Sequence, residues 1–170
     1  MAVAGRMALG LPCRMPLVVR PFYATDAPAC GAVVAATPLW QRSGLDAVRT
    51  ATILNAAHEA GDTLLVLDDG GTVAGFAWVD RRGAFGRSSY LRMIAIAPQR
   101  RSAGLGARLM DAFETIAATE GPDAFLLVSD FNAGAQRFYL RRGYLEVGRL
   151  PEYVMPGVVE VLLWKRVRPT

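Results

Sequence analysis

The chain has 170 residues, of which 52% are hydrophobic and 20% are charged. This length and composition are typical of one globular domain and exclude a protein that is disordered throughout. The apolar runs are far shorter than the ~18 residues that a membrane span needs. Two cysteines and one histidine are too few for a disulfide framework or a structural zinc site. We therefore expect a soluble, cytoplasmic protein that binds neither a membrane nor a metal ion.

The basic residues are concentrated in one part of the chain. The net charge is +4, the pI is about 9.5, and six arginines but one acidic residue lie between positions 80 and 101. A basic surface attracts anions in general, including nucleic acid and phosphorylated cofactors. The arginines fall on both faces of the predicted strands and few aromatic residues lie among them, which does not favour a nucleic-acid partner.

Turn residues and hydrophobic periodicity predict a disordered tail over residues 1–16 and one folded domain over residues 17–170. The tail has no periodicity, and Met15 is an alternative start. The predicted strands lie at 17–20, 64–67, 73–79, 90–97, 125–128, 144–150 and 158–167, and the predicted helices at 26–36, 45–60, 104–119 and 132–142. This order predicts a mixed α/β (α+β) sheet flanked by helices.

Three local patterns make this prediction specific. Asp68-Asp69-Gly70-Gly71 is a hairpin turn between two apolar strands. The continuous apolar run at 125–128 is typical of a strand buried on both faces. The helix at 45–60 is predicted to face the core with one set of residues: Val48, Thr52 or Ile53, and Ala56.

The most informative segment, residues 94–107, ends a strand, makes a tight turn and begins an amphipathic helix. The first N–H groups of a helix lack partners within it, and the helix dipole makes this end partly positive, so phosphate binds there readily. Gly104 and Gly106 let the backbone approach an anion closely, and Arg101 can add a bidentate contact. The segment therefore predicts a pyrophosphate site.

Two other glycine-rich phosphate motifs do not fit this segment. A Rossmann fingerprint needs a third glycine where the chain has Leu109, and a Walker A motif needs a lysine, whereas the single lysine is Lys165. Taken alone, the segment is explained equally well as a structural turn with a surface arginine. A second motif is needed to decide.

That second motif follows about thirty residues later, after an apolar strand: Asn132-Ala133-Gly134-Ala135-Gln136-Arg137-Phe138-Tyr139-Leu140-Arg141-Arg142-Gly143-Tyr144. It is similar to the pattern N-x-x-A-x-x-F-Y-x-x-x-G-F/Y, with Gln136 one place after the alanine. Arg101, Gly104 and Gly106 form R-x-x-G-x-G. Together, in this order, the motifs resemble the signatures of the GNAT superfamily of acetyl-CoA-dependent N-acetyltransferases. The resemblance covers residues 17–168.

The resemblance implies that the strand at 93–97 separates from the strand at 125–129, and that the pantetheine arm of acetyl-CoA binds between them. Backbone groups of the first strand would hold the pantetheine and the acetyl group. N–H groups of the following turn would hold the pyrophosphate, and Asn132 would contact the pantetheine arm. The implied cofactor-binding residues are Ile94, Ala95, Ile96, Arg101, Ser102, Ala103, Gly104, Leu105, Gly106, Ala107 and Asn132.

Tyr139 matches the family tyrosine that protonates the departing thiolate, so the resemblance implies that it is the catalytic acid. A phenol suits this task, because its pKa of ~10 keeps the proton bound at pH 7. Packing within the helix is the alternative explanation of the Phe138-Tyr139 pair.

The chain departs from the family pattern in two places. Ser102 and Ala103 stand where the family often has a glycine and a basic residue, which removes one phosphate contact. The frequent glutamate base of the family has no counterpart, since the central strand carries Leu91, Arg92 and Met93. Either the amine arrives neutral or the base is one of three other acids: Asp130, Glu152 or Glu59.

The acceptor sites of this fold are built by its loops, and the predicted substrate-binding residues are Trp40, Phe85, Arg87, Asp130 and Tyr153. Hydrophobic packing explains Trp40 and Tyr153 equally well. The expected function is direct transfer of an acetyl group from acetyl-CoA to a primary amine of a small molecule or peptide, in a ternary complex. The alternative is a non-catalytic sensor of acyl-CoA. A homodimer is the expected assembly.

Overall fold

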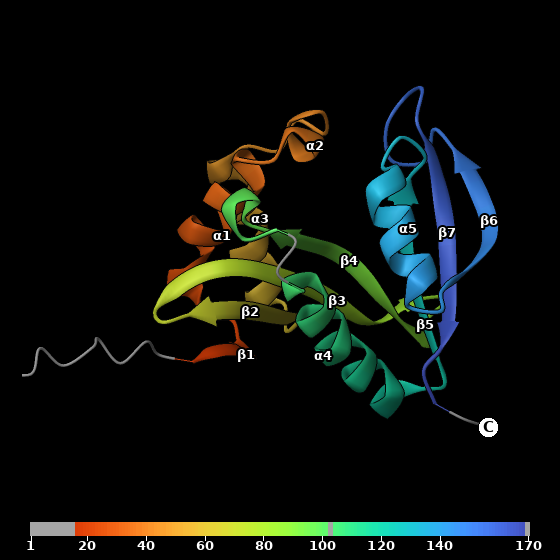
Figure 1. The fold of residues 1–170 in the computed structure, drawn as a ribbon, viewed down its shortest axis with the longest axis horizontal. Helices are drawn as coiled ribbons and strands as arrows, with labels where there is room; N and C mark the ends of the chain where they lie inside the picture. Colours follow the sequence, from red (N-terminus) through yellow and green to blue (C-terminus); the bar gives the residue numbers. More distant parts are fainter. Residues whose placement is uncertain (1–15, 102–103, 169–170) are drawn as a thin grey trace, which may run out of the picture.

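The computed structural model describes residues 16–101 and 104–168 of the chain (Figure 1). These residues form a seven-stranded sheet in the order β1-β2-β3-β4-β5-β7-β6. The strands are β1 Leu17–Pro21, β2 Thr63–Asp69, β3 Thr72–Ala84, β4 Ser88–Ile96, β5 Asp123–Ser129, β6 Leu145–Pro151 and β7 Val159–Arg166. Neighbouring strands are antiparallel except β4 and β5, which are parallel. The predicted mixed sheet is confirmed, whereas the predicted tail lies, apart from Pro16, outside the described residues.

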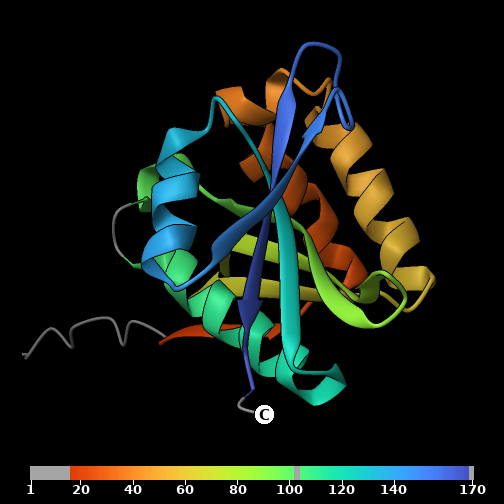
Figure 2. The ribbon, with the colours of Figure 1, turned by 90° about the vertical axis from the view of Figure 1, so that its right-hand side faces the viewer.

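The α-helices of the described residues are α1 Ala27–Ala35, α2 Pro38–Gln41, α3 Ala47–Glu59, α4 Leu105–Glu120 and α5 Ala133–Arg141. α1 and α3 lie on one side of β2–β4, α4 crosses the other side, and α5 lies beside β5 and β7 (Figures 1 and 2). α2 falls between two predicted helices and was not itself predicted; its single turn begins at Pro38, whose fixed φ suits the first helical position. None of these helices is both long and apolar enough to cross a bilayer.

Hydrophobic side chains pack on both faces of the sheet. On one face, the fully buried Leu109 and Phe113 of α4 pack with Val79, Leu126 and Leu163 of the strands. On the other face, α1 and α3 pack against β2, β3 and β4 through a second buried cluster that includes Val34, Leu54, Val66, Phe76 and Ala95. The sheet is therefore the middle layer of the molecule.

The buried side of α3 differs from the predicted one. Thr50, Leu54 and Ala57 are buried at helical spacing, whereas Val48 is 77% exposed and Ala56 is also exposed. The helix is rich in alanine and threonine, so its faces differ little in hydrophobicity. Packing against α1 therefore decides which face is buried.

β5 is also less buried than its apolar run predicted. Ala124, Leu126 and Val128 are buried in the cluster under α4, while Phe125 and Leu127 on the other face are half-buried. A continuous apolar run predicts that other elements pack on both faces of the strand. Here the second face of β5 borders a cavity that Leu127 helps to line.

β4 and β5 pair only over their first residues, and the register pairs are Ser89–Ala124, Tyr90–Phe125 and Leu91–Leu126. Both strands then continue separately. On its other edge, β4 pairs Leu91 with Val79 and Met93 with Trp78, so that Arg92 is an extra residue. Such a β-bulge bends a strand and increases its twist. The two strands therefore part at the bulge.

An ion-pair network ties β1 and β2 to the start of α1. The Arg20 guanidinium donates two hydrogen bonds to Asp26, at 2.7 and 2.9 Å, and a third to Asp68 at 2.8 Å. The backbone N–H of Tyr23 also donates to Asp26, at 2.8 Å. The Arg20 hydrogen bonds hold the pKa of the Asp26 carboxyl below its usual value, against the opposing effect of its burial.

We expect Asp26→Asn to lower the free energy of unfolding by about 2 to 3 kcal/mol at pH 7, because it leaves Arg20 without its closest anion. A lowered pKa gives stability that is complete above the unfolded pKa of about 3.9 and is lost as the pH falls through the folded pKa. The difference between wild type and variant should therefore shrink below about pH 4. Urea unfolding between pH 7 and pH 3 measures it, with the exposed Glu59→Gln as control. A constant difference would show that the ion pair is not its cause.

Candidate functional site

The gap between β4 and β5 exposes backbone groups of β4. The N–H of Ala97 donates to the carbonyl of Ala74 in β3, at 2.9 Å. Successive residues of a strand direct their N–H and C=O groups to opposite sides, so those of Ile94 and Ile96 point away from β3 and into the gap. β5 does not pair with them, because its pairing with β4 ends at Leu91. The gap can therefore accept a ligand that adds to the strand edge.

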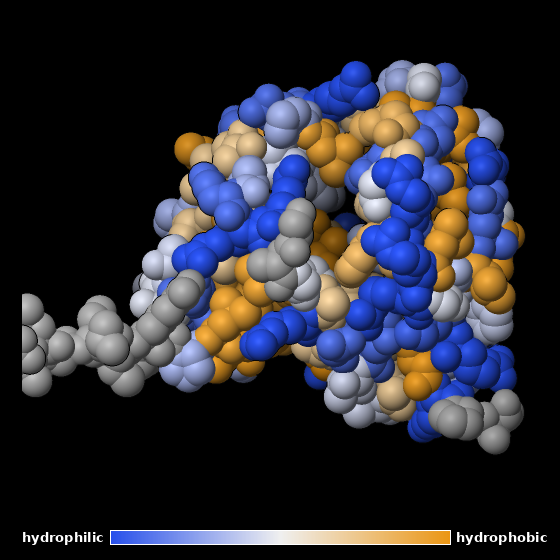
Figure 3. All heavy atoms as spheres, viewed as in Figure 1, coloured by the Kyte–Doolittle hydropathy of each residue, from blue (hydrophilic) through white to orange (hydrophobic). Residues whose placement is uncertain are grey.

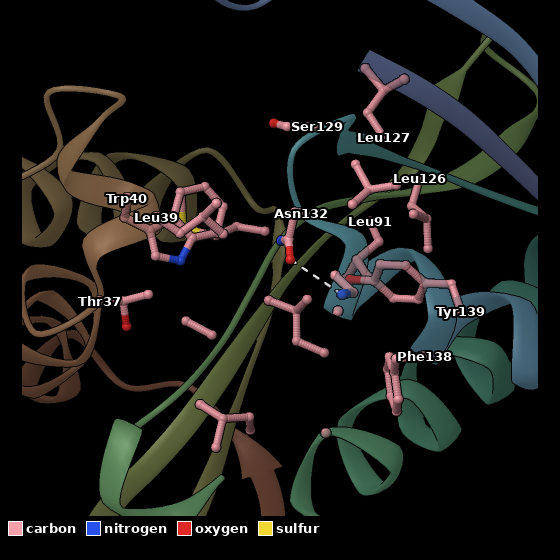
Figure 4. A pocket seen from close by; sticks show the side chains of 18 of the residues that line it. Thr37, Leu39, Trp40, Leu91, Leu126, Leu127, Ser129, Asn132, Phe138 and Tyr139 are labelled. Carbon is pink, nitrogen blue, oxygen red and sulfur yellow. Dashed lines mark hydrogen bonds between the residues drawn. The ribbon is translucent and has the colours of Figure 1, made fainter. Parts of the chain in front are cut away.

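A cavity of about 920 Å³ lies at this gap. It appears as a hollow between the two halves of the molecule in Figure 3, and Figure 4 shows side chains around it. The predicted site residues on its wall are Trp40, Ile94, Ala95, Ile96, Arg101, Gly104, Leu105, Gly106, Ala107, Asn132 and Tyr139. Ser102 and Ala103, also predicted for phosphate binding, lie outside the described residues.

The start of α4 presents free backbone donors to this cavity. Gly104, the N-cap residue, has φ +71°, a left-handed conformation that glycine adopts without strain, and as a glycine it has no side chain to cap the helix. The N–H of Ala107 donates to the Gly104 carbonyl, whereas no group of the described residues is seen to accept from the N–H groups of Leu105 and Gly106, which can therefore bind a ligand. Arg101 donates to the hydroxyl of Thr37 at 3.1 Å and so lies against the end of α1.

Asn132 caps α5 and also borders the cavity. Its side-chain oxygen accepts a hydrogen bond from the N–H of Ala135 at 3.2 Å, drawn as the dashed line in Figure 4. This bond orients the amide, whose NH₂ group can still donate to a ligand. The side chain of Gln136 donates to the carbonyls of Ser129 and Asp130, at 3.1 and 2.8 Å, and fixes α5 to the end of β5.

Tyr139 reaches the cavity from inside the core. The residue is 6% exposed and packs beside Phe138 and Tyr144, with ring centroids 5.3 and 5.9 Å away. Figure 4 shows its ring directed from α5 toward Leu91, with the hydroxyl at the cavity end. Burial raises the pKa of this phenol above its ordinary value, so the hydroxyl keeps its proton at neutral pH.

Four predicted substrate residues do not line the cavity: Phe85, Arg87, Asp130 and Tyr153. Phe85 lies in the turn between β3 and β4, is 82% exposed and packs edge-on against Phe125. Arg87 lies in the same turn. Tyr153 is 68% exposed, while its neighbours Val154 and Met155 form part of the wall. Of the five predicted substrate residues, Trp40 alone lies on the described wall of the cavity.

The three acids suggested as bases also lie off the cavity wall. Glu59 is exposed at the end of α3. Glu152 accepts a hydrogen bond from the N–H of Gly157 at 3.1 Å and closes the turn between β6 and β7. Asp130 is exposed beyond the end of β5.

The structure brings to the cavity several residues that the sequence analysis did not select, among them Glu160 on β7, Tyr90 on β4 and Phe131 after β5. The Arg42 guanidinium lies 4.9 Å from the centre of the Phe131 ring and so connects the segment after α2 to the turn before α5. Glu160 had a signal in the sequence, because it is a single acid within the apolar run 158–163.

Comparison with known proteins agrees with this geometry. The profile of the Acetyltransferase (GNAT) family matches residues 28–144, which is more than half of the chain. The chain belongs to the GNAT acetyltransferase family. A sequence search of curated proteins finds no match to this acetyltransferase.

Solved structures share the fold of this acetyltransferase. A GNAT-family protein from Desulfovibrio desulfuricans has a TM-score of 0.77 and 21% identity, over 90% of this chain and 100% of that chain. yncA from Salmonella typhimurium, solved with its cofactor acetyl-CoA, has a TM-score of 0.70 and 16% identity, over 91% and 95% of the two chains. An aminoglycoside 6'-N-acetyltransferase in complex with coenzyme A has a TM-score of 0.74 and 15% identity, over 90% and 98%.

We expect Gly106→Glu to weaken acetyl-CoA binding by at least tenfold while leaving the melting temperature nearly unchanged. A carboxylate in the first turn of a helix favours the free protein but repels a phosphate at the same place. The new side chain fits, because a Cβ at this position would lie 3.5 Å from Phe138, an ordinary contact distance. Calorimetric titration with acetyl-CoA measures the effect.

The matched control is Gly106→Gln, which has the same size without the charge. Equal weakening by both variants would mean that bulk, and not repulsion of an anion, is responsible.

Proposed function

We propose that this acetyltransferase transfers the acetyl group of acetyl-CoA to a primary amine by direct attack in a ternary complex. The observation that carries the proposal is the meeting, in one cavity, of the unpaired β4 backbone, the uncapped start of α4 and the hydroxyl of Tyr139. A strand edge suits the amides of a pantetheine arm, and a helix N-terminus suits a pyrophosphate.

The assignment of acetyl-CoA is supported by two structural neighbours, one solved with acetyl-CoA and one with coenzyme A. In this chain, the backbone of Ile94 and Ile96 would hold the pantetheine and the thioester. The N–H groups of Leu105 and Gly106 would hold the pyrophosphate. Arg101 already lies at this place, and its guanidinium would add charge-assisted hydrogen bonds.

The chemistry requires an oxyanion donor and an acid. As the amine attacks the acetyl carbon, negative charge develops on the carbonyl oxygen, and a β4 backbone N–H in the gap can stabilise it. The C–S bond then breaks, and its electron pair stays on sulfur. Tyr139, whose raised pKa keeps it protonated, gives its proton to this sulfur.

GNAT acetyltransferases act on amine acceptors that include proteins and small molecules. We propose that the acceptor of this protein approaches from the side opposite to the pyrophosphate, between Trp40 and Phe131 on one wall and Met155 on the other. We also propose that the enzyme is cytoplasmic. We propose in addition that it forms a homodimer, and light scattering of the purified protein would test this assembly.

We expect calorimetry to show one acetyl-CoA site per chain with micromolar affinity. A panel of primary amines, including peptides, polyamines and aminoglycosides, is then tested for release of the CoA thiol. Turnover with any amine supports the proposal. Tight binding without turnover across the panel would instead favour the non-catalytic sensor of acyl-CoA.

We expect Tyr139→Phe to lower kcat by about 10²-fold or more with the best amine of that panel, because the leaving sulfur loses its acid. Acetyl-CoA affinity should change little. The matched control is Tyr144→Phe, which removes a buried hydroxyl that lies off the cavity wall. Equal activity of Tyr139→Phe and wild type would exclude the role of Tyr139 as the acid.

A further inference from the structure

The cavity has a single carboxylate on its described wall, Glu160 of β7. The residue is 4% exposed and pairs in register with Ser129 of β5 and Leu150 of β6. The Ser129 hydroxyl donates to its Oε1 at 2.9 Å. Among the described residues, no arginine or lysine forms a salt bridge with it, and its Oε2 accepts no hydrogen bond.

The strand pattern places Glu160 on the acceptor side of the sheet. Val161 and Leu163 are buried in the cluster under α4, so Glu160 points to the opposite face. Ser129, its partner in register, points to the same face. Tyr90 of β4 also lies near Glu160. Burial, together with the charges of Tyr153 and Glu160, raises the pKa of Tyr90 to about 12.

A buried carboxylate without a cation is costly, since it loses hydration and gains one hydrogen bond in return. Two of the arginines on the wall are paired with other residues. Arg92 stacks 4.8 Å from the Trp78 ring and lies 3.6 Å from Asp80, while Arg100 pairs with Asp69. The free oxygen of Glu160 thus faces a cavity in which a cationic ligand would complete its coordination.

We propose that Glu160 binds the protonated amine of the acceptor and removes its proton. This inference rests on the proposed acetyl transfer and names its substrate class, a cationic alkylamine that is protonated at pH 7. It replaces Asp130, Glu152 and Glu59 as the base. Ser129 is a positioning residue, because its hydroxyl holds one carboxylate oxygen and leaves the other for the ammonium group.

The proton balance of the reaction is complete with these groups. Glu160 takes one proton from the ammonium, and this proton leaves to solvent with each turnover. The neutral nitrogen attacks the acetyl carbon, the C–N bond forms and the C–S bond breaks. The sulfur takes a proton from Tyr139, and the phenolate recovers one from the newly acylated nitrogen.

The test is the pH profile of kcat/KM for Glu160→Gln, with acetyl-CoA and the best alkylamine of the panel. We expect a loss of about 10²-fold or more at pH 7. The loss should shrink as the pH rises toward the pKa of the amine, about 8 for a peptide α-amine and about 10.4 for a lysine side chain. A merely structural role would lower activity equally at every pH.

Other titratable or charged groups lie on the elements around Glu160, and two acids considered earlier as bases serve as controls. They are Tyr90 and Arg92 on β4, Tyr153 between β6 and β7, Asp130 after β5 and Arg149 on β6. Asp130→Asn and Glu152→Gln are expected to keep the wild-type profile. Ser129→Ala should show a smaller loss than Glu160→Gln, with the same dependence on pH.

The outcomes separate this inference from the function on which it rests. If wild type binds acetyl-CoA but acetylates no amine, the proposed function fails. If wild type is active and Glu160→Gln matches it from pH 6 to pH 10, the proposed function stands and the role of Glu160 is excluded. Unchanged acetyl-CoA affinity and melting temperature of Glu160→Gln show that the variant is folded.

Discussion

The site depends on one constraint, the end of pairing between β4 and β5 beyond Leu91 and Leu126. A sheet that continued to pair would satisfy its own backbone and leave no edge inside the molecule. The extra residue at Arg92 bends β4 where this pairing stops. The strands then move apart while α4 and the two hydrophobic clusters keep both halves of the sheet covered. The result is an internal strand edge that can bind a ligand.

Backbone groups form most of one side of the cavity, and side chains form the other. On the cofactor side, backbone N–H and C=O groups of β4 and of the start of α4 make most of the proposed contacts, so few side chains need to be specific. On the acceptor side, side chains from distant segments make the wall, as in the contact between Arg42 and Phe131 and in the position of Glu160 on β7. Structural neighbours of 15% to 21% identity share the fold that builds this cavity.

The proposed acid and base are both buried but have different neighbours. Tyr139 is surrounded by Phe138, Tyr144 and the core under α4, and this burial keeps its proton bound. Glu160 has one hydroxyl donor and an open oxygen at the cavity, which suits a group that must take up a proton. Because each group lies on a rigid element, α5 or β7, their separation is set by the packing of those elements on β5.

The sequence by itself determined the order of strands and helices, the glycine-containing turn at the start of α4 and the motif that contains Asn132 and Tyr139. These are local features, because turn residues, periodicity and spacing act between near neighbours in the chain. It did not determine which side of α3 is buried or how far the two faces of β5 are buried, because both depend on the elements that pack against α3 and β5. Phe85, Arg87, Asp130 and Tyr153 were expected at the acceptor site from loop position, and the structure places them off the cavity wall. Glu160 reaches the cavity only because β7 lies between β5 and β6, so only the tertiary structure, through strand order and register, decided which acid faces the site.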